Sequence, residues 1–185
     1  ESFRAFLNKE VVPHQDAWED AGIVSRDAWK KAGEMGFLLP WADEQYGGSG
    51  LKDFRYEQIM CEELASVNEA GFMLPLHSAL CGPYIAEYGN DEQKARLLPG
   101  IISGELILAV AMTEPGAGSD LAALSTRAVR DGDAFIVNGQ KVWNTQAQFA
   151  DWGILVTRTD PDAPKHKGVT FFLVDMATPG IEVRP

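Results

Sequence analysis

The hydrophobic period of the chain changes in the stretch GELILAVAMTEPGAGSD, residues 104–120. Within it, LILAVAM (106–112) is a continuous apolar run with the length of a buried strand. The run leads into a segment of proline, glycine and hydroxyl residues at 112–120, which we call the glycine loop. Because glycine has no Cβ, this loop would let a flat or phosphorylated ligand approach the backbone closely. Taken alone, such a loop is more often a plain connector than a binding site.

The residues before this stretch predict helices. Asn90 followed by Gln93 is a variant of the capping box and begins a short helix that should end near Leu98-Pro99. Asp53 can open another helix, whose inward face is expected to carry Tyr56, Ile59, Met60 and Leu64. We therefore expect an all-α domain over residues 1–106.

The residues after it predict strands. Short β segments are expected at 125–130, 134–137, 141–143, 152–157 and 169–174. Asp131-Gly132 and Asn138-Gly139 are strong two-residue hairpin turns between the first three of them. The predicted fold class is α+β, with the all-α domain followed by an antiparallel β-barrel or sandwich over residues 107–185. The strand-like segment 181–183 has no visible partner, so we expect the β domain to be incomplete.

Composition excludes several functions. The 185 residues carry 16 basic and 27 acidic side chains, a net charge of −11, which disfavours binding to nucleic acid or to an anionic membrane surface. We expect no transmembrane segment, since no apolar run approaches the roughly 18 residues that a membrane-spanning helix needs. The three histidines are scattered and form no cluster with cysteine, so we expect no metal site.

A second unusual stretch is NGQKVWNT, residues 138–145. If it is a strand, Trp143 and Thr145 lie on the same face. The indole offers a stacking surface and the hydroxyl a hydrogen bond, which suits an extended aromatic cofactor. Taken alone, a core tryptophan beside a surface threonine is the favoured interpretation.

Together the two stretches resemble the acyl-CoA dehydrogenase family, FAD flavoproteins that oxidise acyl-CoA thioesters. The family pattern Thr-Glu-Pro-x-Ala/Gly-Gly-Ser-Asp is matched at 113–120, and Asn-Gly-x-Lys-x-Trp-x-Thr at 138–145, followed by Ala150-Asp151. Residues 46–50 and 89–105 also resemble family segments, so the resemblance covers essentially the whole chain in order. It implies a third, C-terminal helical domain that these 185 residues lack.

The resemblance also implies site residues. FAD would contact Val110, Ala111, Met112, Thr113, Gly118, Ser119, Trp143, Asn144 and Thr145. Met112 and Thr113 would lie against the isoalloxazine ring, Trp143 would pack on it, and Thr145 would bond near N5. Ser119 would also bind the acyl-CoA. Val110 stands where the family often has an aromatic residue and Asn144 where it has isoleucine, which implies an altered flavin environment and acyl-chain fit.

The implied activity is FAD-dependent oxidation of an acyl-CoA to the 2,3-enoyl-CoA, with electrons passed to an electron-transferring flavoprotein. The resemblance also implies that the protein forms a homodimer or a homotetramer. It would be located in the cytoplasm, or in the mitochondrial matrix if its source is a eukaryote. Two alternatives stay open. One is an acyl-CoA oxidase or flavin monooxygenase of the same fold, and the other is a non-catalytic subunit of a hetero-oligomeric acyl-CoA dehydrogenase.

The catalytic base of the family is a glutamate on the third domain. Glu114 lies in the glycine loop and could replace it, but a structural carboxylate that holds the turn before Pro115 is the favoured interpretation. We therefore assign no catalytic residue within 1–185, and we expect this segment alone to be inactive.

Overall fold

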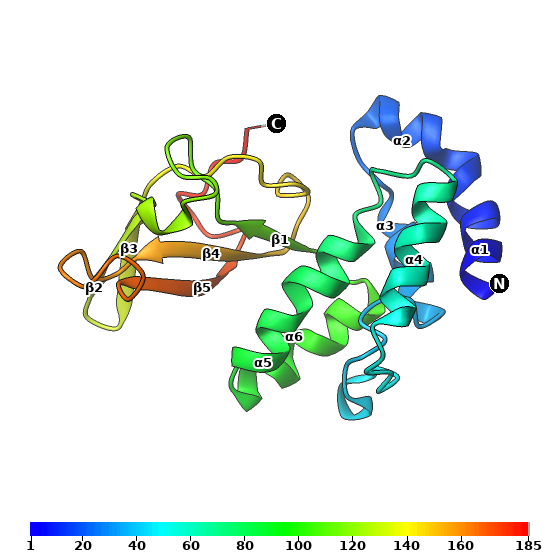
Figure 1. Cartoon of the computed structure of the whole chain (residues 1–185), viewed down its shortest axis with the longest axis horizontal. Coiled ribbons are helices and arrows are strands. Elements are labelled where there is room, and N and C mark those ends of the chain that lie inside the picture. Colours follow the sequence, from blue (N-terminus) through cyan, green and yellow to red (C-terminus); the bar gives the residue numbers. More distant parts are fainter. Residues whose placement is uncertain (185) are drawn as a thin grey trace. The chain divides into compact units, whose positions relative to one another are not determined.

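The computed structural model describes residues 1–184; Pro185, the last residue of the predicted β domain, lies outside the described residues. The chain divides into two compact units, Glu1–Ile107 and a second that begins at Leu108. The first unit is helical and the second is built on a β-sheet (Figure 1). The expected fold class, a helical domain followed by a β domain, is confirmed.

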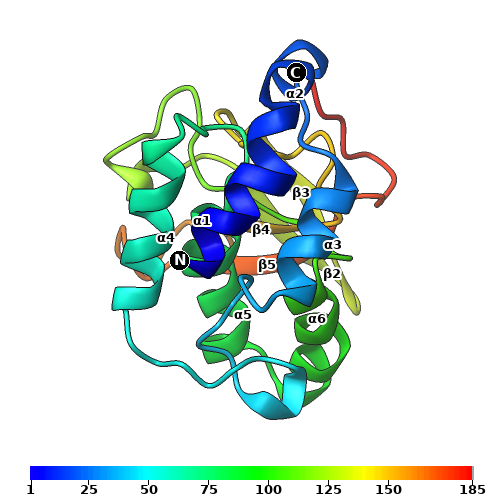
Figure 2. The ribbon, with the colours of Figure 1, turned by 90° about the vertical axis from the view of Figure 1, so that its right-hand side faces the viewer.

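The helical unit contains α-helices with short π and 3-10 turns between them. The α-helices are α1 (Ser2–Phe6), α2 (Gln15–Ala21), α3 (Arg26–Glu34), α4 (Arg55–Ser66), α5 (Gly82–Tyr88) and α6 (Asp91–Ser103). The π turns are Leu7–Val11 and Leu76–Cys81, and the 3-10 turns are Val12–His14 and Glu44–Tyr46. Helices α5 and α6 pack side by side, and α1 lies beside α4 (Figure 2). Within residues 1–184, no helix combines the length and apolar character that crossing a membrane requires.

The capping box at the start of α6 is confirmed. The Gln93 amide donates to Asn90 Oδ1 at 2.8 Å, and the Asn90 amide donates to Gln93 Oε1 at 2.9 Å. The expected end near Leu98-Pro99 is wrong, because the helix continues past Pro99 to Ser103 and ends at Gly104, whose φ is +76°. A left-handed glycine is the usual helix terminator, and here it comes five residues after the proline.

The core of the helical unit is aromatic. The rings of Trp29 and Phe72 meet edge to face at 4.7 Å, and Trp29 lies 5.1 Å from the fully buried imidazole of His77. His77 Nε2 makes a 3.0 Å hydrogen bond with the Ile101 carbonyl. Burial lowers the pKa of His77 to about 4, although this hydrogen bond opposes the shift. The side chain is therefore a neutral part of the core at neutral pH.

Helix α4 buries a different face from the one expected. Met60 and Leu64 are buried as predicted, but Tyr56 and Ile59 are about half exposed and Glu57 is buried in their place. The Glu57 side chain is 5% exposed, and neither of its oxygens has a hydrogen-bond partner within the described chain. Burial raises the pKa of Glu57 to about 7. Glu57 also lines a cavity of about 860 Å³ within the helical unit, together with residues of α5 and α6.

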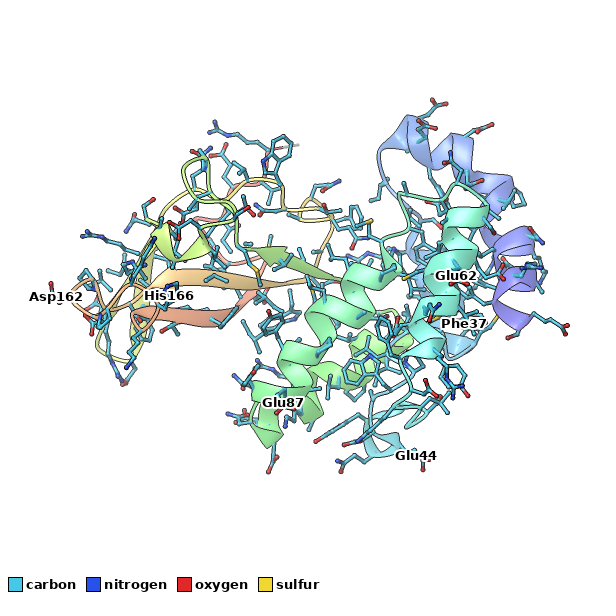
Figure 3. All side chains as sticks on the ribbon, in the orientation of Figure 1. Phe37, Glu44, Glu62, Glu87, Asp162 and His166 are labelled. Carbon is cyan, nitrogen blue, oxygen red and sulfur yellow. The ribbon has the colours of Figure 1, made fainter. Side chains whose placement is uncertain are left out.

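The second unit is a five-stranded mixed sheet. Its strands are β1 (Leu108–Ala111), β2 (Arg127–Asp131), β3 (Ala134–Asn138), β4 (Trp152–Arg158) and β5 (Val169–Asp175), with a 3-10 turn at Leu121–Ala123. Strand β4 is central, since it pairs with β1, with β5 and, through one residue pair, with β2. The loop from β4 to β5 carries Asp162 and His166 (Figure 3).

The expectation of a fully antiparallel sheet is wrong at β1. The pairs β2–β3 and β4–β5 are antiparallel, whereas β1 and β4 are parallel, with Leu108 opposite Trp152. A parallel pair needs a long crossover connection. Residues 112–151 supply it and contain β2, β3 and both unusual sequence stretches.

One predicted hairpin is confirmed and the other is wrong. Asp131 pairs with Ala134 around Gly132, whose φ is +60°, as the Asp131-Gly132 turn predicts. Within the described residues, the next strand after Asn138 begins at Trp152, so the strand expected at 141–143 is absent. Gly139 has a packing role instead, since a Cβ there would lie 2.2 Å from Thr126 Oγ1.

The buried carboxyl of Glu57 gives a pH-dependent prediction. Its pKa is raised from 4.5 to about 7 in the folded protein, so stability is lost as the pH rises from 4.5 to about 7. We expect Glu57→Gln to match the wild type at pH 4.5. At pH 8 it should be more stable by up to about 3 kcal/mol, as measured by urea denaturation of the full-length protein.

Glu62→Gln is the matched control, because Glu62 is an exposed glutamate on the same helix (Figure 3). It should give no stability gain between the two pH values. Equal pH dependence of the two variants would show that the Glu57 carboxyl is not held in a desolvated site.

Candidate functional site

The glycine loop (112–120) leaves β1 through a tight turn. The Glu114 amide donates to the Ala117 carbonyl at 3.0 Å and the Ala117 amide donates back to the Glu114 carbonyl at 3.1 Å. Pro115 and Gly116 form the centre of this turn, where proline is favoured. Among the described residues, no atom beyond each glycine and its two chain neighbours lies within 4 Å of the position that a Cβ would take at Gly116 or Gly118. The backbone of the loop is thus open to a ligand.

A second loop, residues 139–149, carries the tryptophan of the sequence pattern; we call it the tryptophan loop. Trp143 has φ +59° and Gln146 has φ +71°, a left-handed conformation that costs a non-glycine residue about 1–2 kcal/mol. The Trp143 side chain is 87% exposed. The Asn144 Oδ1 atom and both polar atoms of the Gln146 side chain are buried without a hydrogen-bond partner in the described structure. Strained residues and unpaired polar atoms of this kind gather at functional sites.

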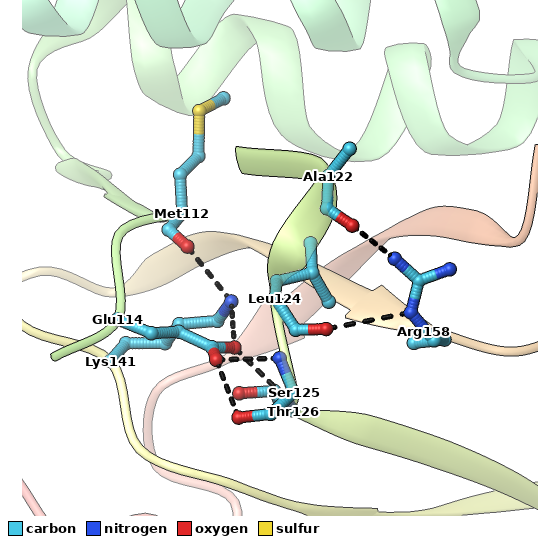
Figure 4. Close-up of polar contacts among 8 residues, drawn as sticks. All are labelled: Met112, Glu114, Ala122, Leu124, Ser125, Thr126, Lys141 and Arg158. Atoms are coloured by element: carbon cyan, nitrogen blue, oxygen red, sulfur yellow. Dashed lines mark hydrogen bonds and ion pairs between the residues drawn. The ribbon is translucent and has the colours of Figure 1, made fainter. Parts of the chain in front are cut away.

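Hydrogen bonds from two successive residues, Lys141 and Val142, join the tryptophan loop to the glycine loop, and Figure 4 shows those of Lys141. Lys141 Nζ donates to the Met112 carbonyl at 2.9 Å and to Glu114 Oε1 at 2.9 Å. The Val142 amide donates to the Thr113 carbonyl, also at 2.9 Å. The residues just before Trp143 are therefore fixed against the start of the glycine loop.

The Glu114 carboxylate has three further donors. Oε2 accepts from the Ser125 amide at 2.6 Å and from the Ser125 hydroxyl at 2.7 Å, and Oε1 accepts from the Thr126 amide at 2.9 Å. Burial alone would raise the pKa of Glu114, but the hydrogen bonds from Thr126, Ser125 and Lys141 outweigh it and hold the pKa well below its ordinary value. An ionised carboxylate surrounded by donors is a poor proton acceptor, so the geometry gives Glu114 a structural role.

The structure places the predicted site residues on three short segments. Val110 and Ala111 end β1, Met112 and Thr113 begin the glycine loop, and Gly118 and Ser119 lie on its exposed part. Trp143, Asn144 and Thr145 lie in the tryptophan loop. The hydrogen bonds of Lys141 and Val142 bring the Met112–Thr113 backbone and the tryptophan loop together. The prediction that a strand places Trp143 and Thr145 on the same face is wrong. The side chains of both residues are nevertheless exposed.

Three supporting residues were missed by the sequence analysis. Ser125 and Thr126 hold Glu114, and Arg158 at the end of β4 donates to the carbonyls of Ala122 and Leu124, on the segment that leads into β2 (Figure 4). Their roles depend on long-range contacts, and in the sequence they look like ordinary strand residues. The lysine of the Asn-Gly-x-Lys pattern was the available signal for the ion pair with Glu114.

The residues present fit the flavin that the sequence resemblance implies. A flavin ring is flat, aromatic and bordered by hydrogen-bonding atoms. An exposed indole, a neighbouring exposed hydroxyl on Thr145 and an open glycine loop offer a stacking surface, a polar contact and backbone access. The unpaired Asn144 Oδ1 adds a polar atom without a protein partner in the described residues.

Known proteins are similar to this chain. Residues 1–105 match the family model of the acyl-CoA dehydrogenase N-terminal domain, and residues 109–185 match that of the middle domain. The mitochondrial long-chain specific acyl-CoA dehydrogenase of Sus scrofa is 44% identical over 182 residues, which cover 97% of this chain and 42% of that protein.

Two solved structures are also similar. A crystal structure of acyl-CoA dehydrogenase from Geobacillus kaustophilus is 50% identical with a TM-score of 0.92, covering 97% of this chain and 47% of that one. A glutaryl-CoA dehydrogenase from Mycobacterium smegmatis, in complex with FADH2, is 31% identical with a TM-score of 0.86, covering 96% of this chain and 44% of that one.

The chain therefore belongs to the acyl-CoA dehydrogenase family. It spans less than half the length of these three relatives.

The left-handed backbone at Trp143 gives a second prediction. Trp143→Gly and Trp143→Ala both remove the exposed indole, but only glycine adopts φ +59° without strain. We expect the glycine variant of the flavin-free protein to be more stable than the alanine variant by about 1 kcal/mol in chemical denaturation. Equal stability of the two variants would contradict a strained backbone at this position.

Proposed function

We propose that the whole protein oxidises an acyl-CoA thioester to the 2,3-enoyl-CoA with bound FAD and passes the electrons to an electron-transferring flavoprotein. Membership of the acyl-CoA dehydrogenase family supports the reaction class. The observation that best supports FAD as the cofactor is the exposed Trp143 indole. A strained backbone presents this indole beside the open glycine loop.

The proposed roles divide between the two loops. Bound FAD supplies the acceptor for the hydride that leaves the β-carbon. Met112 and Thr113 lie against the isoalloxazine ring, and the Thr113 amide and hydroxyl bond its pyrimidine end. Trp143 packs on the ring, and Thr145 makes a hydrogen bond near N5. Val110, Ala111, Gly118 and Asn144 complete the cofactor contacts, and Ser119 binds both FAD and the pantetheine and phosphate portion of acyl-CoA.

The reaction also needs a base that removes the α-proton, and we propose that it lies outside residues 1–185. Glu114 is the acidic residue nearest in sequence to Thr113, but its oxygens already accept hydrogen bonds from Ser125, Thr126 and Lys141. Its lowered pKa leaves it ionised and weakly basic at neutral pH.

We propose that residues 1–106 form the N-terminal domain and residues 107–185 form part of the middle domain. The protein would act as a homodimer or homotetramer in the cytoplasm, or in the mitochondrial matrix if its source is a eukaryote. The relatives described above extend to more than twice the length of this chain, which leaves room for the base on another domain.

The test uses the full-length protein. We expect a yellow protein that releases FAD on denaturation, and anaerobic titration with a panel of acyl-CoA thioesters should bleach the flavin absorbance. An alkyl-CoA thioether is the matched control, because it lacks the carbonyl that makes the α-protons acidic, and it should cause no bleaching.

Oxygen consumption separates this proposal from an oxidase or a monooxygenase. A dehydrogenase should consume oxygen slowly during turnover and respond strongly to an added electron acceptor. Rapid oxygen uptake would favour the same-fold alternatives. A colourless protein that releases no FAD would exclude a flavin enzyme.

A further inference from the structure

Lys141 and Glu114 form a buried ion pair between the two loops. Their charged atoms are 2.9 Å apart, and their side chains are 6% and 4% exposed. The residues are 27 positions apart in the sequence. A buried ion pair adds little stability compared with well-packed apolar side chains, because both charges lose their hydration. Its presence here is better explained by the geometry that it imposes.

That geometry concerns two successive carbonyl groups. Lys141 uses one donor for Glu114 and another for the Met112 carbonyl, while the Val142 amide holds the Thr113 carbonyl. The next residue, Trp143, has the left-handed backbone that exposes its indole. A displacement of Lys141 would therefore move the ring surface relative to the Met112–Thr113 backbone.

Glu114 extends the same geometry to the start of β2. The hydrogen bonds described for its carboxylate all come from donors: Lys141, the two Ser125 groups and the Thr126 amide. A glutamine at 114 could not satisfy these donors, since its amide nitrogen would face a donor in either orientation. The site thus requires an anion at 114 and a cation at 141.

We propose that Lys141 and Glu114 are positioning residues that set the spacing between the glycine loop and the tryptophan loop for the flavin, without either side chain contacting the flavin itself. This inference rests on the proposed flavin function. It gives the glutamate of Thr-Glu-Pro and the lysine of Asn-Gly-x-Lys a shared role, because each is the partner of the other.

The central test is Lys141→Met in the full-length protein. Methionine keeps much of the side-chain length but donates no hydrogen bond. We expect FAD affinity, measured by equilibrium dialysis, to fall at least about tenfold, because the displaced loops would no longer hold the indole and the Met112–Thr113 backbone at the spacing that the flavin requires. The visible absorbance band of the bound flavin should shift. Lys141→Arg keeps the charge and the donors, and it should recover part of the affinity and the wild-type band.

Phe172→Ala is the control for general loss of stability. Phe172 packs against Phe135 in the same unit, with ring centroids 4.9 Å apart. Both variants are compared at a temperature where each is folded. The control should bind FAD within about twofold of wild type and leave the absorbance band unchanged, since this pair contributes to packing. Equal FAD affinity and equal spectra for Lys141→Met and Phe172→Ala would overturn the positioning role.

A flavin-free measurement keeps this inference separate from the proposed function. Amide hydrogen exchange at Val142 reports its bond to the Thr113 carbonyl without any cofactor. We expect faster exchange at Val142 in Lys141→Met than in Phe172→Ala, and equal rates would overturn the inference. A wild-type protein that binds no FAD would overturn the flavin function, and with it the flavin role of the pair.

Discussion

The second unit depends on the ionised carboxylate of Glu114 and the donors that surround it. Lys141 and the adjacent residues Ser125 and Thr126 come from two places in the sequence, and all three donate hydrogen bonds to this one side chain. Since the group is buried, its charge is tolerable only while these donors stay in place. The carboxylate therefore fixes the glycine loop, the tryptophan loop and the start of β2 with respect to one another.

This constraint explains why the crossover from β1 to β4 is ordered. Residues 112–151 contain little regular structure outside the β2–β3 hairpin, and a connection of this length pays a considerable entropy penalty when it is fixed. Apolar packing of Ala117 and Leu124 against Val156 covers one part of it. The polar network adds hydrogen bonds from Lys141 and Val142 to the carbonyls of Met112 and Thr113.

Local rules predicted much of the fold from the sequence. The capping box at Asn90, the turn at Gly132 and the change of period after Gly104 depend on neighbouring residues, and the structure contains all three. The predicted buried face of the helix that contains Glu57 was wrong. Periodicity gives the spacing of the buried residues, but which side of the helix is buried depends on the elements that pack against it. The strand at 141–143 was wrong because Val142 bonds to a loop carbonyl and Trp143 turns left-handed.

The candidate site combines a rigid interior with a strained surface. Trp143 and Gln146 hold left-handed conformations that their side chains disfavour, so the surrounding structure must compensate. Two residues before Trp143, the Lys141 ammonium is bonded to Glu114 and to the Met112 carbonyl, and these contacts fix the backbone that leads into Trp143. The net charge of −11 gives anionic ligands no general attraction to this chain. Under the proposed function, a cofactor or a CoA thioester would be recognised by local groups, and the exposed indole beside open backbone would provide such groups only while the interior network keeps them in place.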